Sequence, residues 1–298
     1  MASTPRIVVL DQDANTRKLL TAALEDDDSG AEIIAAPGAS EALARLKAPP
    51  PVDLVVADPA NPSPWGWGLI AELRQAAVGV PILVVSVVQT EQSMARSMEM
   101  GADDYLLKPI DLSEYRKTVA RMLVERRELL AKGGVKEDPN ARLTVRSEGQ
   151  GMLVEVNAPT WSMHVSRFER FVNRLVALSL SNDEALKMRL ALEEIITNAK
   201  EWGNRGDGRK MLKLSYCLLS DRVTFRIEDQ GDGFDPGDVP DPTLDPLDHV
   251  KRRKQSGKRI GGWGILLARK AMDEVAYNRK GNVVFLTKFL RKSELTKT

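Results

Sequence analysis

Short apolar runs alternate with amphipathic stretches from the N-terminus to about residue 110, and this alternation limits the possible folds more than any other feature. Continuous apolar runs are typical of strands buried on both faces, and they predict strands at Ile7–Leu10, Ala31–Ala36, Leu54–Ala57, Ile82–Val85 and Tyr105–Leu107. Helical spacing of apolar residues predicts helices between them, at Asn15–Glu25, Ser40–Lys47, Gly68–Gln75 and Glu91–Met100. Strands and helices in this order predict an α/β domain with a doubly wound, five-stranded parallel sheet.

Polar side chains follow four of the predicted strands. They are Asp11, Gln12 and Asp13 after the first strand, Asp58 after the third, Ser86 after the fourth and Lys108 after the fifth. Open parallel sheets bind ligands at the carboxyl ends of their strands, where these groups should meet. Clustered carboxylates repel one another unless a hard cation such as Mg²⁺ neutralises them. Asp58 could therefore attack a phosphoryl donor and form an acyl phosphate, with Ser86 and Lys108 holding the phosphoryl oxygens. Each residue alone could be an ordinary polar strand end, but four in this order are harder to explain that way.

Residues 5–125 resemble a two-component receiver domain through the segments VVLDQD, VDLVVADPANPSPWG, VVSVV and GADDYLLKP. The resemblance implies that Asp58 is the phosphoacceptor and that Ser86 and Tyr105 are the switch hydroxyl and the switch aromatic residue. Lys108 matches the lysine of the family, and the loop after Asp58 has Pro62 and Gly66 at the usual places.

One departure from the receiver pattern concerns the metal. The resemblance implies Mg²⁺ ligands among Asp11, Asp13 and Asp58, but Gln12 stands where the family has its directly ligating acid. A neutral amide in place of a carboxylate should weaken Mg²⁺ binding. A receiver that is used only for docking, without phosphorylation, is therefore the alternative.

The predicted join between the domains is a long helix followed by glycines. The helix begins near Leu112, continues through RMLVERRELLAK and should end at the pair Gly133-Gly134. We expect a receiver at residues 1–132 with an extended last helix, a linker at 133–142 and a second domain at 143–298. The long helix could be a lever, a dimer contact or a plain spacer.

The second half contains a helix with a carboxylate and an amide on one edge. In Lys187–Asn204, apolar residues recur at helical spacing, while Glu194 and Asn198 lie one turn apart. This pair suits a divalent ion and a reacting phosphate, although a solvated amphipathic helix would look the same. An expected hairpin, Met211–Leu219 with Arg222–Glu228, leads into the turn DQGDGFD that starts at Asp229.

A second glycine cluster follows the turn. Gly261, Gly262 and Gly264 open the predicted helix Ile265–Met272, where backbone amides can approach a phosphate closely. Pro236–Lys258, between the clusters, has the composition of a mobile lid with a basic run at its end. The spacing matches neither a Walker A loop nor the dinucleotide fingerprint.

Residues 143–290 resemble the Bergerat-fold (GHKL) ATPases, an α+β two-layer sandwich, and most of all their anti-sigma-factor serine/threonine kinase branch. The segments that carry the resemblance are LALEEIITNAKEWGN, IEDQGDGFDP and IGGWGILLARKAMDEVAYNRKGNVVFLTK. It implies that Asn198 holds the Mg²⁺ of bound ATP, that Asp229 accepts the adenine amino group and that Glu194 is the general base. The implied shaping residues of the nucleotide pocket are Gly231, Gly233, Gly261, Gly262 and Gly264, and Trp202 stands where the branch often has histidine.

These expectations together favour a response regulator whose receiver controls an ATP- and Mg²⁺-dependent serine/threonine kinase. The implied partners are a small antagonist protein of the STAS type, a sigma factor or both, and an upstream histidine kinase; a homodimer is possible. The main alternative is a module that binds nucleotide and sequesters partners without transferring phosphate. A hybrid histidine kinase is disfavoured because His164 and His249, the two histidines of the chain, lie inside the second domain and its lid.

Composition excludes further classes of function. Lys and Arg number 43 and Asp and Glu 42, so no bulk charge favours DNA or an anionic membrane, and no basic helix-turn-helix is found in the second half. No apolar run approaches the ~20 residues needed to span a bilayer, and the N-terminus lacks a secretory pattern. Cys217 is the single cysteine, which fits a reducing compartment, so we expect a cytoplasmic protein.

Overall fold

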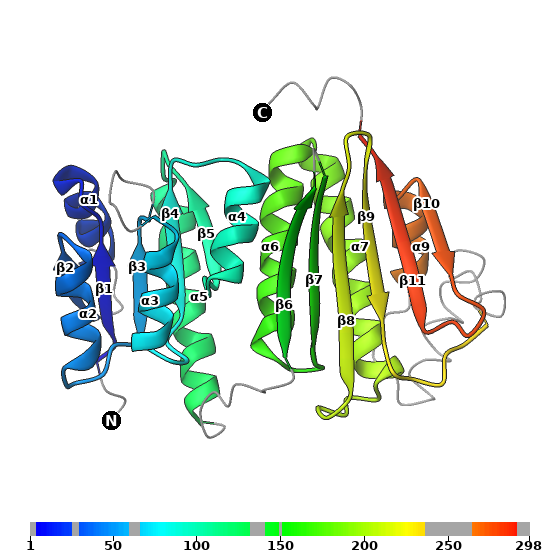
Figure 1. Cartoon of the computed structure of the whole chain (residues 1–298), viewed down its shortest axis with the longest axis horizontal. Helices are drawn as coiled ribbons and strands as arrows, with labels where there is room; N and C mark the ends of the chain where they lie inside the picture. Colours follow the sequence, from blue (N-terminus) through cyan, green and yellow to red (C-terminus); the bar gives the residue numbers. More distant parts are fainter. Residues whose placement is uncertain are drawn as a thin grey trace. The chain divides into compact units, whose positions relative to one another are not determined.

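The computed structural model describes residues 4–25, 30–59, 66–131, 141–148, 151–235 and 264–290. The chain divides into two compact units, Met1–Glu137 and Asp138–Thr298 (Figure 1). Several sequence predictions lie outside the described residues, namely Pro62, residues 133–140 of the linker, the lid at 236–258 with His249, and the glycines Gly261 and Gly262.

The first unit is a parallel five-stranded sheet with the strand order β2-β1-β3-β4-β5. The strands are β1 (Arg6–Leu10), β2 (Glu32–Ala36), β3 (Leu54–Ala57), β4 (Ile82–Ser86) and β5 (Asp104–Leu107). The helices that alternate with them are α1 (Ala14–Glu25), α2 (Ala39–Lys47), α3 (Gly68–Ala76), α4 (Glu91–Glu99) and α5 (Leu112–Ala131). The predicted doubly wound sheet is confirmed, and the predicted strands and the first four helices begin and end within one residue of the observed ones.

Helices cover both faces of this sheet. Every residue of β3 and β4 is buried, which requires cover on both sides. One core side contains Val9, Val56 and Leu83 together with Tyr115 and Met122 of α5. Each fully buried aliphatic side chain of this kind contributes about 1.5–3 kcal/mol of transfer free energy. Because β1 and β3 are neighbours but not consecutive, the strand order reverses between them, and the residues after these strands flank the switch point of the sheet.

The second unit is built on a six-stranded sheet with antiparallel pairing and the order β10-β11-β9-β8-β7-β6. The strands are β6 (Arg142–Glu148), β7 (Gly151–Pro159), β8 (Met211–Leu218), β9 (Arg222–Glu228), β10 (Glu274–Tyr277) and β11 (Val283–Phe289). The described helices are α6 (Met163–Ser179), α7 (Asn182–Asn198), the short π-helix η1 (Ala199–Gly203) and α9 (Gly264–Ala271).

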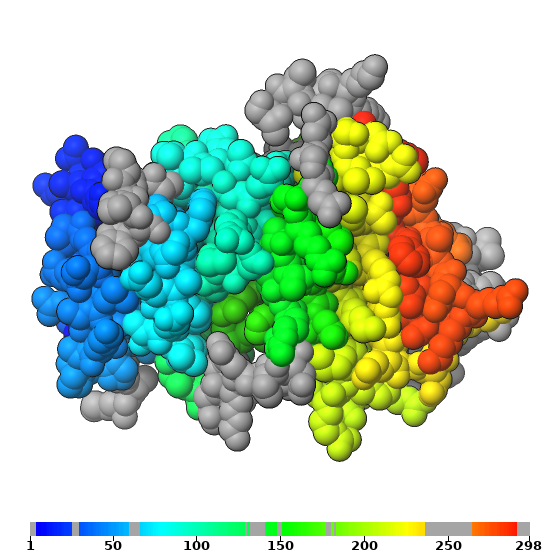
Figure 2. Space-filling view, viewed as in Figure 1, coloured from blue at the N-terminus to red at the C-terminus, as the bar shows by residue number. Residues whose placement is uncertain are grey.

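Helices α6 and α7 of this unit lie against one face of the sheet (Figure 1). Buried and half-exposed residues alternate strictly along β9, as expected for strands covered on one side. Figure 1 shows α6 and α7 behind the sheet, and Figure 2 shows its other face, where the yellow β8–β9 hairpin lies beside the red β11. The predicted two-layer α+β sandwich is therefore confirmed, while β10 and β11 had not been predicted as strands. Across the described ranges, no helix combines the length and the apolar character that a membrane crossing needs.

The helix that carries Glu194 and Asn198 differs from its prediction in one respect. Ser181 caps its N-terminus, because the Ser181 hydroxyl accepts the Glu184 N–H and donates to the Glu184 carboxylate. At its other end the regular α-helix stops at Asn198, and residues 199–203 form a π-turn instead of another α-turn. Such turns shift the side chains that follow them and are frequent at functional sites.

Candidate functional site

The carboxyl ends of β1, β3 and β5 meet in a cluster of two carboxylates and one ammonium. Lys108 Nζ lies 2.7 Å from Asp11 Oδ2 and 2.5 Å from Asp58 Oδ2. Both carboxylates are buried, so the lysine bridges groups that lie 97 and 50 residues away from it in the sequence. Burial by itself would lower the pKa of Lys108, but the hydrogen bonds to Asp11 and Asp58 outweigh burial and raise it. Lys108 is therefore a fixed positive charge beside the carboxylate of Asp58.

The predicted switch residues lie next to this cluster. Ser86 is fully buried at the end of β4, and its hydroxyl accepts the Val88 N–H at 3.3 Å. The Tyr105 hydroxyl donates to the Val88 carbonyl at 2.7 Å, so the ring is turned inward. Burial raises the pKa of Tyr105 to about 12; a hydrogen bond with Ser86 opposes this rise and the charge of Asp58 adds to it. The structure thus brings Asp58, Ser86, Tyr105 and Lys108 together.

Asp13, the second acid after the first strand, caps a helix, and its role as a Mg²⁺ ligand stays a prediction. The Asp13 carboxylate is exposed and accepts the Thr16 N–H at 2.7 Å, which caps α1 and lowers the pKa of Asp13. Gln12 is exposed as well. In the part of the chain that the structure describes, no three acidic, histidine or cysteine side chains are grouped as metal ligands. Asp11 and Asp58 are the two carboxylates that lie together around Lys108 at this edge, and Mg²⁺ usually has one or two carboxylate ligands in proteins.

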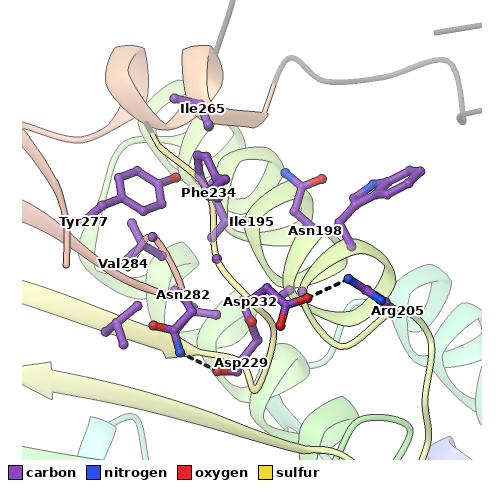
Figure 3. Close-up of a pocket in the computed structure, with 17 residues that line it drawn as sticks. Ile195, Asn198, Arg205, Asp229, Asp232, Phe234, Ile265, Tyr277, Asn282 and Val284 are labelled. Carbon is purple, nitrogen blue, oxygen red and sulfur yellow. Dashed lines mark hydrogen bonds and ion pairs between the residues drawn. The ribbon is translucent and has the colours of Figure 1, made fainter. Parts of the chain in front are cut away.

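A cavity of about 380 Å³ opens in the second unit between the α7–η1 segment and the sheet (Figure 3). Apolar side chains form most of its lining: Ile195, Ala199, Ile227, Phe234, Ile265, Tyr277, Val283 and Val284. The Phe234 and Tyr277 rings pack edge to face, with centroids 5.3 Å apart. The polar groups that line it include Asn198, Asp229 and Asn282. A largely apolar pocket with few polar groups is the usual form of a small-molecule site.

Asp229 lies at one end of this cavity and is held by hydrogen bonds with Asn282 and Gly231. Its N–H donates to the Asn282 carbonyl at 3.1 Å, and its own carbonyl accepts Asn282 Nδ2 at 2.9 Å. Its carboxylate Oδ1 accepts the Gly231 N–H at 2.7 Å. Burial raises the pKa of Asp229, while the Gly231 hydrogen bond and two lysine charges partly offset the rise. The second carboxylate oxygen is the group that a ligand's N–H donor can use.

Two residues that sequence reasoning missed shape this end of the site. Gly203 lies directly behind the Asp229 side chain, since a Cβ at Gly203 would come within 2.3 Å of the carboxylate carbon. Asn204 is fully buried; its Oδ1 accepts the Gln230 N–H at 2.8 Å and its Nδ2 donates to Thr160 Oγ1 at 2.9 Å. Gly203 and Asn204 thus hold the turn after β9 in place, through packing and a hydrogen bond. The pattern GN after the helix was visible in the sequence, but Gln230 and Thr160, which Asn204 contacts, lie 26 and 44 residues away along the chain.

We expect Gly203→Ala to displace the Asp229 carboxylate, because the added methyl group would overlap it. The expected result is a loss of ligand binding in the cavity of at least about tenfold, with far-ultraviolet circular dichroism unchanged. Gly208→Ala is the matched control, because a Cβ there meets only an ordinary contact at 3.4 Å with Trp161. Equal binding by both variants would contradict the assigned packing of Asp229.

The other predicted residues meet at α7 and the start of α9. A Cβ at Gly264 would lie 2.9 Å from Asn198 Nδ2 and 3.0 Å from Glu194 Cβ, so the first residue of α9 packs against both. Asn198 lines the cavity directly, as does Trp202, which is 43% exposed. Figure 3 shows Asn198 and Ile265 at one part of the cavity and Asp229 at another. Three sequence segments that are separated along the chain therefore line one site.

The turn after β9 is held from its far side by the turn between β10 and β11. Phe234 N–H donates to the Lys280 carbonyl at 3.1 Å. Gly233 has a φ of +80°, and any Cβ there would overlap the Lys280 carbonyl oxygen at 1.7 Å. Glycine is therefore required at 233 both for its backbone conformation and for the close approach of the two turns.

The sequence matches two protein families, one in each unit. Residues 7–120 match the response regulator receiver domain, and residues 159–288 match the histidine kinase-like ATPase domain.

Curated relatives match part of this chain. A protein of Leptolyngbya boryana, described as an uncharacterized 14.6 kDa protein in the sodA1 3′ region, is 36% identical over 115 residues, which are 38% of this chain and 86% of that protein. The probable transcriptional regulatory protein SilR of Salmonella typhimurium is 32% identical over 127 residues, which are 43% of this chain and 47% of SilR. This chain therefore spans about half the length of SilR.

Among solved structures, the response regulator receiver domain protein (CheY-like) of Methanospirillum hungatei JF-1 is 24% identical. The match covers 42% of this chain and 98% of that chain, with a TM-score of 0.39.

Proposed function

Because the chain belongs to the response regulator receiver family over residues 7–120 and continues into a histidine kinase-like ATPase domain over residues 159–288, we propose that its receiver controls an ATP- and Mg²⁺-dependent serine/threonine protein kinase. In this proposal the kinase phosphorylates a small antagonist protein of the STAS type and also binds a sigma factor or a similar target. An upstream histidine kinase supplies the phosphoryl group of the receiver.

The observation that carries the kinase proposal is that Asn198 and Asp229 line one cavity, while Gly264 at the start of α9 packs against Asn198 and Glu194. The carboxylate of Asp229 can accept an N–H group of adenine, and the apolar middle of the cavity suits the ribose. The backbone N–H groups at the start of α9 suit the phosphates. The cavity of about 380 Å³ lies within the range of small-molecule sites. The residues present therefore fit a nucleotide.

Each residue has a distinct part in the proposal. Asp229 accepts the amino group of adenine, and Ile195 and Val284 contact the base through apolar atoms. Asn198 supplies an oxygen ligand to the Mg²⁺ that accompanies ATP and neutralises phosphate charge. Glu194 takes the proton from the attacking serine or threonine hydroxyl. A pure binding module does not need a base at this place, so Glu194 favours a kinase over a sequestering module.

The direct test combines binding with transfer. Isothermal calorimetry at millimolar Mg²⁺ should detect ATP binding, and a pull-down in the presence of ATP should yield a partner whose phosphorylated residues are mapped by mass spectrometry. Phosphoserine or phosphothreonine on that partner supports the kinase. ATP binding without any transfer to a captured partner supports the sequestering module instead, and absence of ATP binding overturns both.

For the receiver, we expect Asp58→Asn to abolish phosphoryl uptake from a small-molecule donor such as acetyl phosphate at high Mg²⁺. The amide cannot form the acyl phosphate, although it can keep a hydrogen bond with Lys108. Asp111→Asn is the matched control: the exposed Asp111 carboxylate caps the start of α5, and asparagine is an equally good cap, so uptake should stay within about twofold. Mass spectrometry of the intact protein measures both. No uptake by the parent protein would favour a receiver that only docks.

We further propose that the state of Asp58 changes kinase output through α5 (Leu112–Ala131). Helix α5 packs into the receiver core through Tyr115, Val119 and Met122, so a change in the receiver can be passed to its far end. Equal kinase activity of Asp58→Ala and of the receiver with a bound phosphoryl mimic would remove this coupling.

A further inference from the structure

Arg205, at the end of the π-turn, has a backbone conformation that arginine seldom adopts. Its φ is +57°, and it is the single non-glycine residue with positive φ among the residues that the structure describes. The Lys200 carbonyl accepts the Gly206 N–H at 2.9 Å, which closes a helix C-terminal turn around Arg205. Glycine is the usual residue at the left-handed position of such turns, because a side chain there costs conformational free energy. A reason for the arginine side chain should therefore exist outside the backbone.

The Arg205 side chain crosses the rim of the cavity. Arg205 Nη2 lies 2.6 Å from Asp232 Oδ2, and both residues line the cavity, where Figure 3 shows them joined near Asp229. Asp232 lies three residues after Asp229, and Arg205 lies two residues after Gly203, which packs behind the Asp229 carboxylate. The ion pair therefore joins the turn after η1 to the loop that carries Asp229.

The turn that carries Arg205 is itself anchored. Trp161 Nε1 donates to the Gly206 carbonyl at 3.1 Å, and Lys200 lies 2.7 Å from Glu169 and over the Trp161 ring at 5.9 Å. Asn204, the residue before Arg205, is fully buried and hydrogen-bonded. Arg205 therefore extends from a fixed point toward Asp232.

Stability of the fold does not explain the pair. The Arg205 and Asp232 side chains are 73% and 85% exposed, and exposed ion pairs add little to stability. We infer that Arg205 is a positioning residue of the nucleotide site: through Asp232 it holds the Asp229 loop against the η1 turn and slows the release of bound nucleotide. This inference rests on the proposed ATP site, and it adds a residue that acts on retention rather than on the chemical step.

The test is the dissociation rate of ATP that carries a fluorescent ribose substituent, measured by stopped flow on the full chain at low and high salt. Arg205→Gly removes the side chain and also relieves the left-handed strain, so the variant should fold as well as the parent. At low salt we expect Arg205→Gly and Asp232→Asn each to release the nucleotide about threefold to fivefold faster than the parent. The double variant should release it no faster than either single variant. At 1 M salt the difference should disappear, because the Debye length falls to about 3 Å.

Two further variants separate positioning from a general loss of charge. The exchange of charges, Arg205→Asp with Asp232→Arg, should restore slow release. Arg209→Ala removes an exposed arginine that lies 3.0 Å from Asp207; neither residue lines the cavity, so this variant should release nucleotide at the parental rate.

Parental release rates for Arg205→Gly and Asp232→Asn at low salt would overturn the inference, as would additive effects of the two substitutions. A parent protein that binds no ATP would instead overturn the proposed function together with this inference. The two failures are distinguishable because the parental affinity is measured in the same experiment.

Discussion

Asp229→Asn should weaken ATP binding by about 10- to 150-fold, the largest loss of affinity that we expect from any single substitution in the cavity. The reason is geometric. The asparagine oxygen can keep the hydrogen bond from the Gly231 N–H, which now goes to Asp229 Oδ1 at 2.7 Å. The asparagine Nδ2 then replaces the oxygen that would accept the adenine amino group, so that a donor faces a donor. Calorimetry at fixed Mg²⁺ measures the loss.

The matched control is Asp221→Asn, which makes the same change of charge at an exposed position beside Arg222, on the hairpin between β8 and β9. It should bind ATP as the parent does. A second readout is the choice of base: the parent should prefer ATP over GTP, because guanine presents a carbonyl where adenine has its amino group, and Asp229→Asn should lose most of that preference. Unchanged affinity and base preference in Asp229→Asn would show that Asp229 does not recognise the base.

The pH dependence of the same site follows from the raised pKa of Asp229, whose first cause is burial. The ionised carboxylate is the stronger acceptor, so ATP affinity should fall as the pH falls through this raised pKa, at a higher pH than for an ordinary aspartate. The stability of the protein without ligand should change in the opposite sense. A folded-state pKa above the unfolded value stabilises the fold below the unfolded pKa, and this contribution is lost as the pH rises through the folded pKa. Asp229→Asn should remove both trends, which thermal melts and binding titrations from pH 4 to pH 7 can check.

Glu194→Gln should leave ATP affinity within about twofold of the parent and reduce phosphoryl transfer by about 10²- to 10⁴-fold, the usual contribution of a general base. Glutamine has nearly the same shape as glutamate, so the packing of Gly264 against the Glu194 Cβ is preserved. What it loses is the ability to accept a proton from the substrate hydroxyl. The measurement is single-turnover transfer to the partner protein, together with calorimetry on the same preparation.

Glu193→Gln provides the control, because Glu193 is the exposed neighbour of Glu194 on α7 and has the same charge. It should transfer phosphate at the parental rate. If Glu194→Gln transfers phosphate as fast as Glu193→Gln, then the base is another group or the reaction needs none.

Sequence periodicity alone predicted the receiver sheet closely because its signals are local. A buried parallel strand is a continuous apolar run, and an amphipathic helix is a repeat of about 3.6 residues, so Leu54–Ala57 and Gly68–Ala76 could be recognised without knowing their neighbours. The parallel, doubly wound arrangement of the strands also followed, since alternating strands and helices permit few topologies. The convergence of Asp11, Asp58 and Lys108 was predictable for the same reason.

The same local patterns were insufficient where long-range contacts decide the outcome. Strands β10 and β11 were not predicted; β11 pairs with β9, and β10 pairs with β11 at the edge of the sheet. The predicted helix through Trp202 became a π-turn, because Asn204 must reach Thr160 and Gln230 at once.

By itself, the sequence determined the two kinds of sheet, the polar strand ends of the receiver and the three segments that contribute Glu194, Asp229 and Gly264. Only the tertiary structure decided how close Gly203 lies to Asp229 and that Arg205 crosses the cavity rim to Asp232. The physical reason is that hydrophobic periodicity is carried by neighbouring residues, whereas a cavity wall is made by side chains that meet only after the chain has folded.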